Sequence, residues 1–151
     1  MNFTRLSDIF FYQNARFPQK IALASRALDG SWATFSSAEC LVEIDKLSAG
    51  LLTAGFKKGD RIGILAHAGS PRWQFADLGC QQIGVVTVPI HSTARADEIA
   101  FIIEDSGLRG CFFSNQKMLE KLLEAGVFWE KKWSFEPTDG VENWENLACE
   151  P

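Results

Sequence analysis

The sequence predicts an α/β fold with a mainly parallel sheet and flanking helices. Short apolar runs typical of buried strands alternate with longer segments whose apolar residues recur every three or four positions, as on one helix face. Glycine, proline or aspartate lies at most boundaries between these segments. One helix between successive strands favours right-handed β-α-β units, and such units place neighbouring strands parallel.

The beginning of the chain predicts a helix followed by a hairpin. Helical spacing extends over Leu6–Phe17, and Pro18 disfavours helical backbone in the residue before it. Two β-prone runs, at 20–24 and 32–35, then flank Asp29-Gly30, a dipeptide typical of a hairpin turn.

The next helix has signals at both ends. Ser36 and Glu39 have the spacing of a capping box, in which the serine hydroxyl and the carboxylate each accept a hydrogen bond from a backbone N–H. Gly55 fits the position where a left-handed residue ends a helix, with Phe56 as its apolar partner. The residues with helical spacing between these signals, which predict one buried face, are Cys40, Ile44, Leu47 and Leu51.

Three strand and helix pairs follow. Strands are predicted at 61–66, 85–90 and 110–114, and helices at 71–83, 96–106 and 116–125. The second strand is apolar on both faces, as expected inside a parallel sheet. Ser70 is expected to cap the first of these helices, and Pro71 fits its first turn. The helical residues expected to face the core are Trp73, Ala76, Cys80, Ile83, Ile99, Ile102, Ile103, Leu119, Leu122 and Leu123.

The periodic pattern stops after residue 126. The aromatic residues beyond it lie among charges without a helical or strand period; they are Trp129, Trp133, Phe135 and Trp144. No buried face can be assigned to them. We therefore divide the chain into an α/β unit at 1–126 and an irregular extension at 127–151.

Composition and charge exclude several classes of protein. The chain has 151 residues, 46% of them hydrophobic, with 12 Phe and 5 Trp, which predicts a globular domain with its own core. The net charge is −4 and basic residues occur singly or in pairs, unlike a nucleic-acid-binding surface. No apolar run approaches the roughly 20 residues of a membrane span, and no secretory signal is evident. We expect a cytoplasmic protein; contact with a membrane surface stays open.

The four cysteines do not predict a disulfide framework or a zinc site. Cys40, Cys80, Cys111 and Cys149 lie 30 or more residues apart, with no C-x-x-C pair. Three of them lie inside apolar patterns, where cysteine behaves as a small hydrophobic residue.

Two histidines are the first candidates for chemistry. His67 and His91 each follow a predicted strand, at the end where ligands bind in open α/β sheets. Each is either a base or binding residue, or an exposed or hydrogen-bonded loop residue. The helix start at Ser70-Pro71 offers N–H groups to an anion, but every helix has such an end. Neither G-x-x-x-x-G-K-[ST] nor G-x-G-x-x-G occurs in the sequence.

The acidic residues and Trp73 have structural explanations. Asp60 lies in a turn, where aspartate bonds to nearby backbone, and Asp97-Glu98 falls in a helical first turn that favours anions. Asp77 is expected to pair with Arg72 or with another helix, and Trp73 is expected in the core. We assign no catalytic, cofactor-binding or metal-binding residue.

Short motifs occur in a particular order over residues 6–125. They are Leu6-Ser7-Asp8, Ala15-Arg16-Phe17-Pro18, Lys20-Ile21-Ala22-Leu23, Trp32-Ala33-Thr34-Phe35-Ser36, Leu47-Ser48-Ala49-Gly50-Leu51, Lys58-Gly59-Asp60-Arg61-Ile62-Gly63-Ile64, Pro71-Arg72-Trp73, Ala76-Asp77, Ile83-Gly84-Val85-Val86-Thr87-Val88-Pro89-Ile90, Glu98-Ile99-Ala100-Phe101-Ile102-Ile103 and Asp105-Ser106-Gly107. In this order they resemble the N-terminal segment of the AMP-forming acyl-CoA synthetases, in the adenylate-forming superfamily. The stretch Gln81-Gln82-Ile83-Gly84, and Val88-Pro89-Ile90 with Thr93, favour the long-chain fatty-acid branch.

The chain departs from the family pattern at three places. Ala68-Gly69-Ser70-Pro71-Arg72-Trp73 replaces the usual Asn-Arg-Pro-Glu-Trp, His91 replaces a tyrosine, and Arg95-Ala96 replaces Ser-Pro. These changes affect the assignment of a subfamily or substrate more than that of the fold.

The resemblance implies a parent enzyme that uses ATP, Mg²⁺ and coenzyme A. Such an enzyme joins ATP and a fatty acid to give an acyl-adenylate and pyrophosphate, then transfers the acyl group to coenzyme A. A Ser/Thr/Gly-rich phosphate loop with a lysine neutralises the leaving pyrophosphate. In the family this loop and the mobile C-terminal domain lie downstream of the matched region. The sequence contains no such loop, so we expect no cofactor in this chain.

Two functions remain open. The favoured one is the N-terminal portion of such a synthetase, which forms a scaffold for the active-site cleft, is not catalytic alone and has the rest of the enzyme as partner. The alternative is a free-standing, non-catalytic interaction or regulatory module derived from that subdomain. An independent enzyme ranks third, because a fold alone does not define a function.

We predict that the isolated chain self-associates or is poorly soluble. A segment of a larger body exposes the apolar surface that met its neighbour, and the tryptophans after residue 127 are candidates for that patch or for a cap over it. Light scattering after gel filtration and the binding of a hydrophobic dye test this. A monomer that binds no dye contradicts it.

Overall fold

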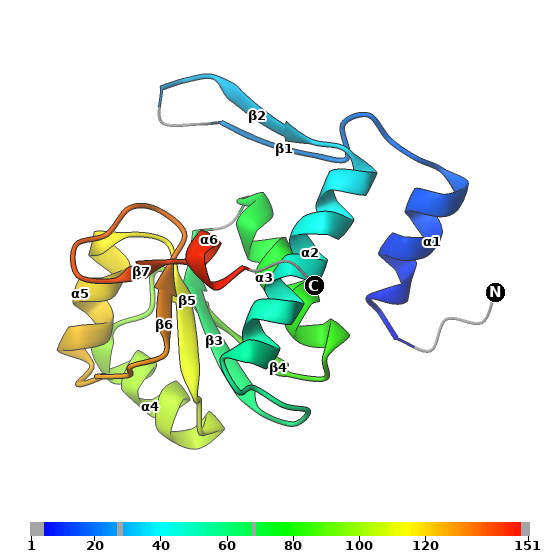
Figure 1. The fold of residues 1–151 in the computed structure, drawn as a ribbon. Helices are drawn as coiled ribbons and strands as arrows, with labels where there is room; N and C mark the ends of the chain where they lie inside the picture. Colours follow the sequence, from blue (N-terminus) through cyan, green and yellow to red (C-terminus); the bar gives the residue numbers. More distant parts are fainter. Residues whose placement is uncertain (1–4, 27–28, 68, 149–151) are drawn as a thin grey trace.

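A computed structural model describes residues 5–26, 29–67 and 69–148 (Figure 1). Ala68 and Cys149, named above, lie outside the described residues. The elements in chain order are α1 (Asp8–Arg16), β1 (Leu23–Arg26), β2 (Trp32–Phe35), α2 (Ser37–Thr53), β3 (Arg61–Ala66), α3 (Pro71–Gln82), β4 (Val86–His91), α4 (Ala96–Ser106), β5 (Gly110–Phe113), α5 (Gln116–Glu124), β6 (Lys132–Ser134), β7 (Glu142–Asn143) and α6 (Trp144–Leu147).

The structure confirms the α/β fold with a parallel sheet. Within the described residues, five strands lie in the order β4-β3-β5-β6-β7, and each pair is parallel. Helices α2 and α3 pack on one face of this sheet, and α4 and α5 lie on the other (Figure 1). Strands β1 and β2 form the separate antiparallel hairpin that the sequence predicted, although β1 begins later than expected. The hairpin lies beyond the carboxyl ends of β3 and β5.

Helix α2 has both of its predicted end signals. The Ser36 hydroxyl accepts a hydrogen bond from Glu39 N–H at 3.2 Å, and the Glu39 carboxylate accepts one from Ser36 N–H at 2.7 Å. Gly55 has a φ of 82°, in the left-handed region, and Phe56 N–H donates to the Leu51 carbonyl at 3.0 Å. The buried face of α2 consists, as predicted, of Cys40, Ile44, Leu47 and Leu51.

Three expectations about later elements are wrong. Ser70 lies at the N-cap of α3, but its hydroxyl makes no capping hydrogen bond. Strand β4 is at the edge of the sheet, so Val86 is 50% exposed despite its apolar sequence. The edge position also suits Pro89, which has no N–H to donate. On α5, Leu123 is 43% exposed, because the face toward the sheet consists of Met118, Leu119 and Leu122.

The segment after residue 126 has regular structure that its sequence did not reveal. Strands β6 and β7 extend the sheet, although they are only three and two residues long, too short to show a period. Trp133, Phe135 and Trp144, to which the sequence pattern assigned no buried face, are buried. Phe135 stacks on Phe112 with ring centroids 5.8 Å apart. The domain boundary at residue 126 stays a prediction.

Helix α6 returns the chain to α2. A Cβ atom on Gly50 of α2 would lie 1.9 Å from the Leu147 carbonyl oxygen, so only glycine permits this approach. Trp144 packs beside Phe75 of α3, with ring centroids 6.4 Å apart. Trp144 and Leu147 therefore belong to the same core as α2 and α3.

Much apolar surface is exposed near the N-terminus. Helix α1 has no buried residue, and Leu6, Phe17 and Ile21 are each more than half exposed. Phe101 and Phe128 are exposed elsewhere. The exposed apolar residues thus differ from the tryptophans that the sequence suggested. Among the described helices, none combines the length and hydropathy needed to cross a bilayer.

The capping box of α2 predicts a pH-dependent contribution to the free energy of unfolding. The hydrogen bond from Ser36 N–H, and then that from its hydroxyl, lowers the pKa of Glu39. A carboxyl group whose pKa is lower in the folded state stabilises the fold above its unfolded pKa of about 4.5 and loses this effect as the pH falls further. Glu39→Ala should therefore reduce the free energy of unfolding at pH 7 but much less at pH 3. Ser36→Ala should cost about 1 kcal/mol at pH 7.

Urea unfolding followed by circular dichroism at both pH values measures these effects. Glu120→Ala is the control, since within the described part of the chain the Glu120 side chain is exposed and makes no hydrogen bond or ion pair. Equal effects of Glu39→Ala and Glu120→Ala at pH 7 would show that the capping box does not stabilise the fold.

Candidate functional site

The strand order reverses direction between β3 and β5. Strand β3 connects through α3 to β4 on one side, and the chain then crosses through α4 to β5 on the other side. In open α/β sheets, ligands bind in the crevice beyond the carboxyl ends of the strands at such a switch point. His67 directly follows β3 and Ser114 directly follows β5, so both residues lie at this crevice.

Ser114 joins the ends of three strands. Its buried hydroxyl oxygen accepts a hydrogen bond from His67 N–H at 2.9 Å, beyond β3. Its own N–H donates to the Leu65 carbonyl at 3.2 Å, and its carbonyl accepts from Glu136 N–H at 3.0 Å, beyond β6. These bonds fix the carboxyl edge of the sheet where the crevice begins.

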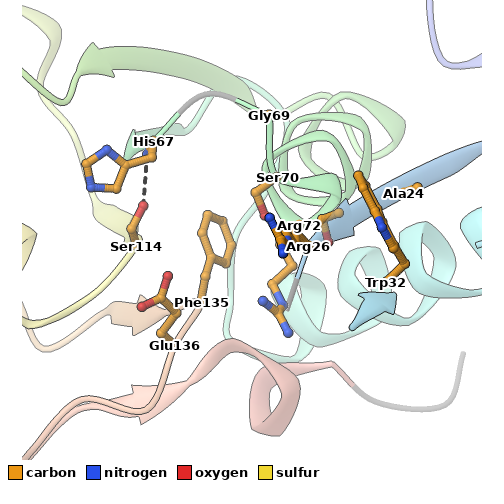
Figure 2. Close-up of a pocket in the computed structure, with 11 residues that line it drawn as sticks. Ala24, Arg26, Trp32, His67, Gly69, Ser70, Arg72, Ser114, Phe135 and Glu136 are labelled. Carbon is orange, nitrogen blue, oxygen red and sulfur yellow. Dashed lines mark hydrogen bonds between the residues drawn. The ribbon is translucent and has the colours of Figure 1, made fainter. Parts of the chain in front are cut away.

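A pocket of about 330 Å³ lies between this edge and strands β1 and β2 of the hairpin (Figure 2). Its wall includes both charged and aromatic side chains. Figure 2 shows Arg26 and Arg72 on one side of the pocket, with Phe135 between them and Glu136. The other lining residues are Ala24, Ser25, Trp32, His67, Gly69, Ser70 and Ser114.

The two candidate histidines lie at the predicted edge but in different pockets. Ala66 and His91 are register partners, so His67 follows β3 while His91 ends the neighbouring strand β4. His67 is exposed and lines the pocket described above. His91 lines a second pocket of about 450 Å³, where its Nδ1 lies 2.7 Å from the Thr93 hydroxyl. The structure therefore does not bring the two imidazoles together into one acid-base site.

Asp77 was expected to pair with Arg72 or with another helix. It does not pair with Arg72. Its carboxylate accepts hydrogen bonds from the Thr87 hydroxyl and, at 2.8 Å, from Gln81 Nε2. These partners direct Asp77 toward β4 and away from the pocket. Within the described residues, the Arg72 side chain has no hydrogen bond and no ion pair.

The other acidic candidates have the structural roles that were expected. Asp60 accepts a hydrogen bond from Lys57 N–H at 2.9 Å and also pairs with Arg109. Arg95 lies 2.8 Å from Asp97, and its hydrogen bond lowers the pKa of that carboxyl group. Glu98 accepts from Arg95 N–H at 2.8 Å.

The described cysteines are buried in the core and have no nucleophilic character. Cys40, Cys80 and Cys111 are free thiols. Burial raises the pKa of Cys111 to about 12 and raises the pKa of Cys80 as well, so the thiolate is scarce at neutral pH. Trp73 is partly buried against the core, in agreement with its predicted role.

Sequence reasoning missed most of the residues that line the first pocket. Ser114 ends a predicted strand, and that position at the carboxyl edge was a usable signal. Phe135 and Glu136 follow β6, a strand that the sequence did not reveal. Arg26 and Trp32 reach the pocket only through the placement of the hairpin.

Comparison with known proteins identifies the family. The model of the AMP-binding enzyme family matches residues 10–143, and the chain belongs to this family. A long-chain-fatty-acid–CoA ligase, FadD15 of Mycobacterium bovis, is 30% identical over 95 residues, 63% of this chain and 16% of that protein. The rat mitochondrial medium-chain acyl-CoA ligase ACSF2 is 29% identical over 101 residues, 67% of this chain and 16% of that protein. The chain thus spans about a sixth of the length of these relatives.

Solved structures share the fold. A structure described as a long-chain-fatty-acid CoA ligase from Rhodopseudomonas palustris has a TM-score of 0.80 at 23% identity, over 97% of this chain and 36% of that one. The N-terminal subdomain of NpsA from Klebsiella oxytoca has a TM-score of 0.70 at 21% identity, over 95% of this chain and 32% of that one.

We predict that Ser114→Ala loosens the carboxyl edge of the sheet. The substitution removes the acceptor of His67 N–H, which should cost about 1 kcal/mol of unfolding free energy and speed hydrogen exchange at that amide. Ser92→Ala is the control, because the Ser92 hydroxyl makes no hydrogen bond with other described residues. Urea unfolding and amide exchange measure both variants, and equal effects would contradict the role of Ser114.

Proposed function

We propose that the chain is the N-terminal portion of an AMP-forming acyl-CoA ligase, which converts ATP, a fatty acid and coenzyme A into acyl-CoA, AMP and pyrophosphate. The match of the family model to residues 10–143 carries this proposal. The relatives named as CoA ligases support it, because this chain aligns with only 16% of their length. Fatty acid is the proposed substrate class because the M. bovis relative is named a long-chain-fatty-acid ligase.

Within that enzyme, the proposed role of this segment is to support the active-site cleft. The carboxyl edge at the switch point, held by Ser114, would form one wall of the cleft. The remainder of the enzyme is the proposed partner, and the exposed apolar residues around α1 are surface that it could cover.

The residues present do not fit the cofactors of the whole enzyme. The sequence has no glycine-rich phosphate loop with a lysine. Among the described residues, no group of three His, Cys, Asp or Glu could hold a metal ion. We therefore assign the binding of ATP, Mg²⁺ and coenzyme A to the remainder of the enzyme, and we propose that this chain is inactive alone.

One observation favours the alternative of a free-standing, non-catalytic module. The segment after residue 126 closes the core of this chain with Trp133 and Trp144, both buried. A chain that covers its own core in this way meets a requirement for independent folding. The mass of the natural protein distinguishes this alternative from the ligase.

We predict that an antibody against this chain detects a protein several times larger than 16.8 kDa in the cells that make it. That protein should catalyse fatty-acid-dependent exchange between ATP and pyrophosphate, whereas the 151-residue chain should not. A natural species of 16.8 kDa would contradict the ligase assignment. Exchange by the 151-residue chain alone would contradict its proposed inactivity.

A further inference from the structure

Arg72 is a half-buried cation whose side chain has no hydrogen-bond or ion-pair partner in the part of the chain that the structure describes. It lies in the first turn of α3, and its expected partner Asp77 bonds instead to Thr87 and Gln81. No other acidic side chain within the described residues pairs with it. A guanidinium group that is partly removed from water and lacks an acceptor is favoured to bind one from outside.

A second arginine lines the same pocket from a different element. Arg26 ends β1, and its Nε donates to the Gly30 carbonyl at 3.4 Å, across the hairpin turn. This bond directs the side chain along the hairpin and leaves the terminal nitrogens as donors. Figure 2 shows Arg26 and Arg72 on the same side of the pocket.

One serine hydroxyl adds a neutral donor beside the arginines. The Ser70 hydroxyl does not cap α3, although the residue lies at the N-cap position. Ser114 lines the pocket on the other side of Phe135, beside His67 and Glu136, and its hydroxyl accepts from His67 N–H (Figure 2). Two guanidinium groups and the Ser70 hydroxyl offer more donors than the two oxygens of a carboxylate require.

The charge and size of the pocket also suit a compact anion. Glu136 is the acidic residue of its lining, and Figure 2 shows it across Phe135 from the two arginines. Two arginines and one glutamate give the lining of this pocket an excess of positive charge, while Glu43 and Glu145 line a neighbouring pocket with Arg72. The volume of about 330 Å³ is enough for a small oxyanion together with several waters of about 30 Å³ each.

We infer that this pocket binds a tetrahedral oxyanion of the phosphate class between Arg26 and Arg72. Bidentate contacts from the arginines hold it, and the Ser70 hydroxyl, which Figure 2 shows beside Arg72, adds a further hydrogen bond. The site consists of this chain's own residues, so it goes beyond the proposed ligase activity and does not depend on it.

Titration of the ¹⁵N-labelled 151-residue chain with inorganic phosphate, followed by NMR, tests the site. Amide signals of Gly69, Ser70 and Arg72 and the Nε signals of both arginines should shift with one saturating curve. Sodium chloride at matched ionic strength is the salt control. Phosphate should bind at least tenfold more tightly than acetate, and equal affinities would overturn the tetrahedral assignment.

Substitution of the arginines completes the test. Arg72→Gln should weaken phosphate binding at least tenfold, and Arg72→Lys should have an intermediate effect because it keeps the charge but loses the planar donor group. Arg16→Gln is the matched control, since Arg16 is an exposed arginine of α1 and does not line the pocket. Circular dichroism verifies folding, and Arg26→Gln serves as second variant if Arg72→Gln does not fold.

Two results would overturn the inference. One is the absence of phosphate-dependent shifts at the pocket beyond those caused by chloride. The other is the same phosphate affinity in the folded Arg72→Gln or Arg26→Gln variant as in Arg16→Gln. Because no ATP, fatty acid or coenzyme A is used, neither result bears on the proposed ligase function.

Discussion

Strand β3 pairs with a parallel neighbour on both edges, and the remaining architecture depends on this arrangement. Its residues from Ile62 to Ala66 are all buried, because helices cover both faces of the sheet. Burial of each large aliphatic side chain, such as Ile62, Ile64 or Leu65, is worth about 1.5–3 kcal/mol. With β4 on one side and β5 on the other, the chain has a switch point at the carboxyl end of β3.

The burial of β3 also explains why polar residues lie beyond the ends of the strands. Backbone groups inside the sheet are paired along β3, and side chains beside that strand are apolar. Polar side chains are therefore found beyond the strand ends, where the backbone turns into loops and α3 begins. Ser114 ties these loops together, and the hairpin tip brings Arg26 over them from a distant part of the sequence. The result is a polar pocket on a rigid edge, which suits a wall of a larger cleft as well as an anion site.

The C-terminal aromatic residues cover one side of the hydrophobic core. Phe112 of β5 stacks on Phe135 and contacts Trp133, while Trp144 reaches Phe75 of α3. Such ring pairs add about 0.5–1.5 kcal/mol each beyond the area that they bury. Since Gly50 lets α6 approach α2, the end of the described chain is fixed to the same helix that follows the hairpin. The segment after residue 126, whose sequence has no periodic apolar pattern, thus contributes to the main core.

The sequence by itself determined the class of fold and most elements, because these depend on local signals. The capping box of Ser36 and Glu39, the stop at Gly55 and the apolar periodicity of α2 each involve residues close in the chain. The motif order over residues 6–125 likewise indicated the family to which the chain belongs. Positions of His67 and His91 at the carboxyl edge followed from strand ends alone.

Only the tertiary structure decided the edge position of β4, the burial of Trp133 and Trp144, and the partners of Asp77. Strand order depends on which strands pair, and a parallel crossover gives no local signal of that choice. The pocket is the clearest case, since Arg26 and Arg72 lie 46 positions apart in the numbering and line it from different elements. Asp77 bonds to Thr87 on the adjacent strand and not to Arg72, because Thr87 offers a hydroxyl donor that no helical spacing could reveal.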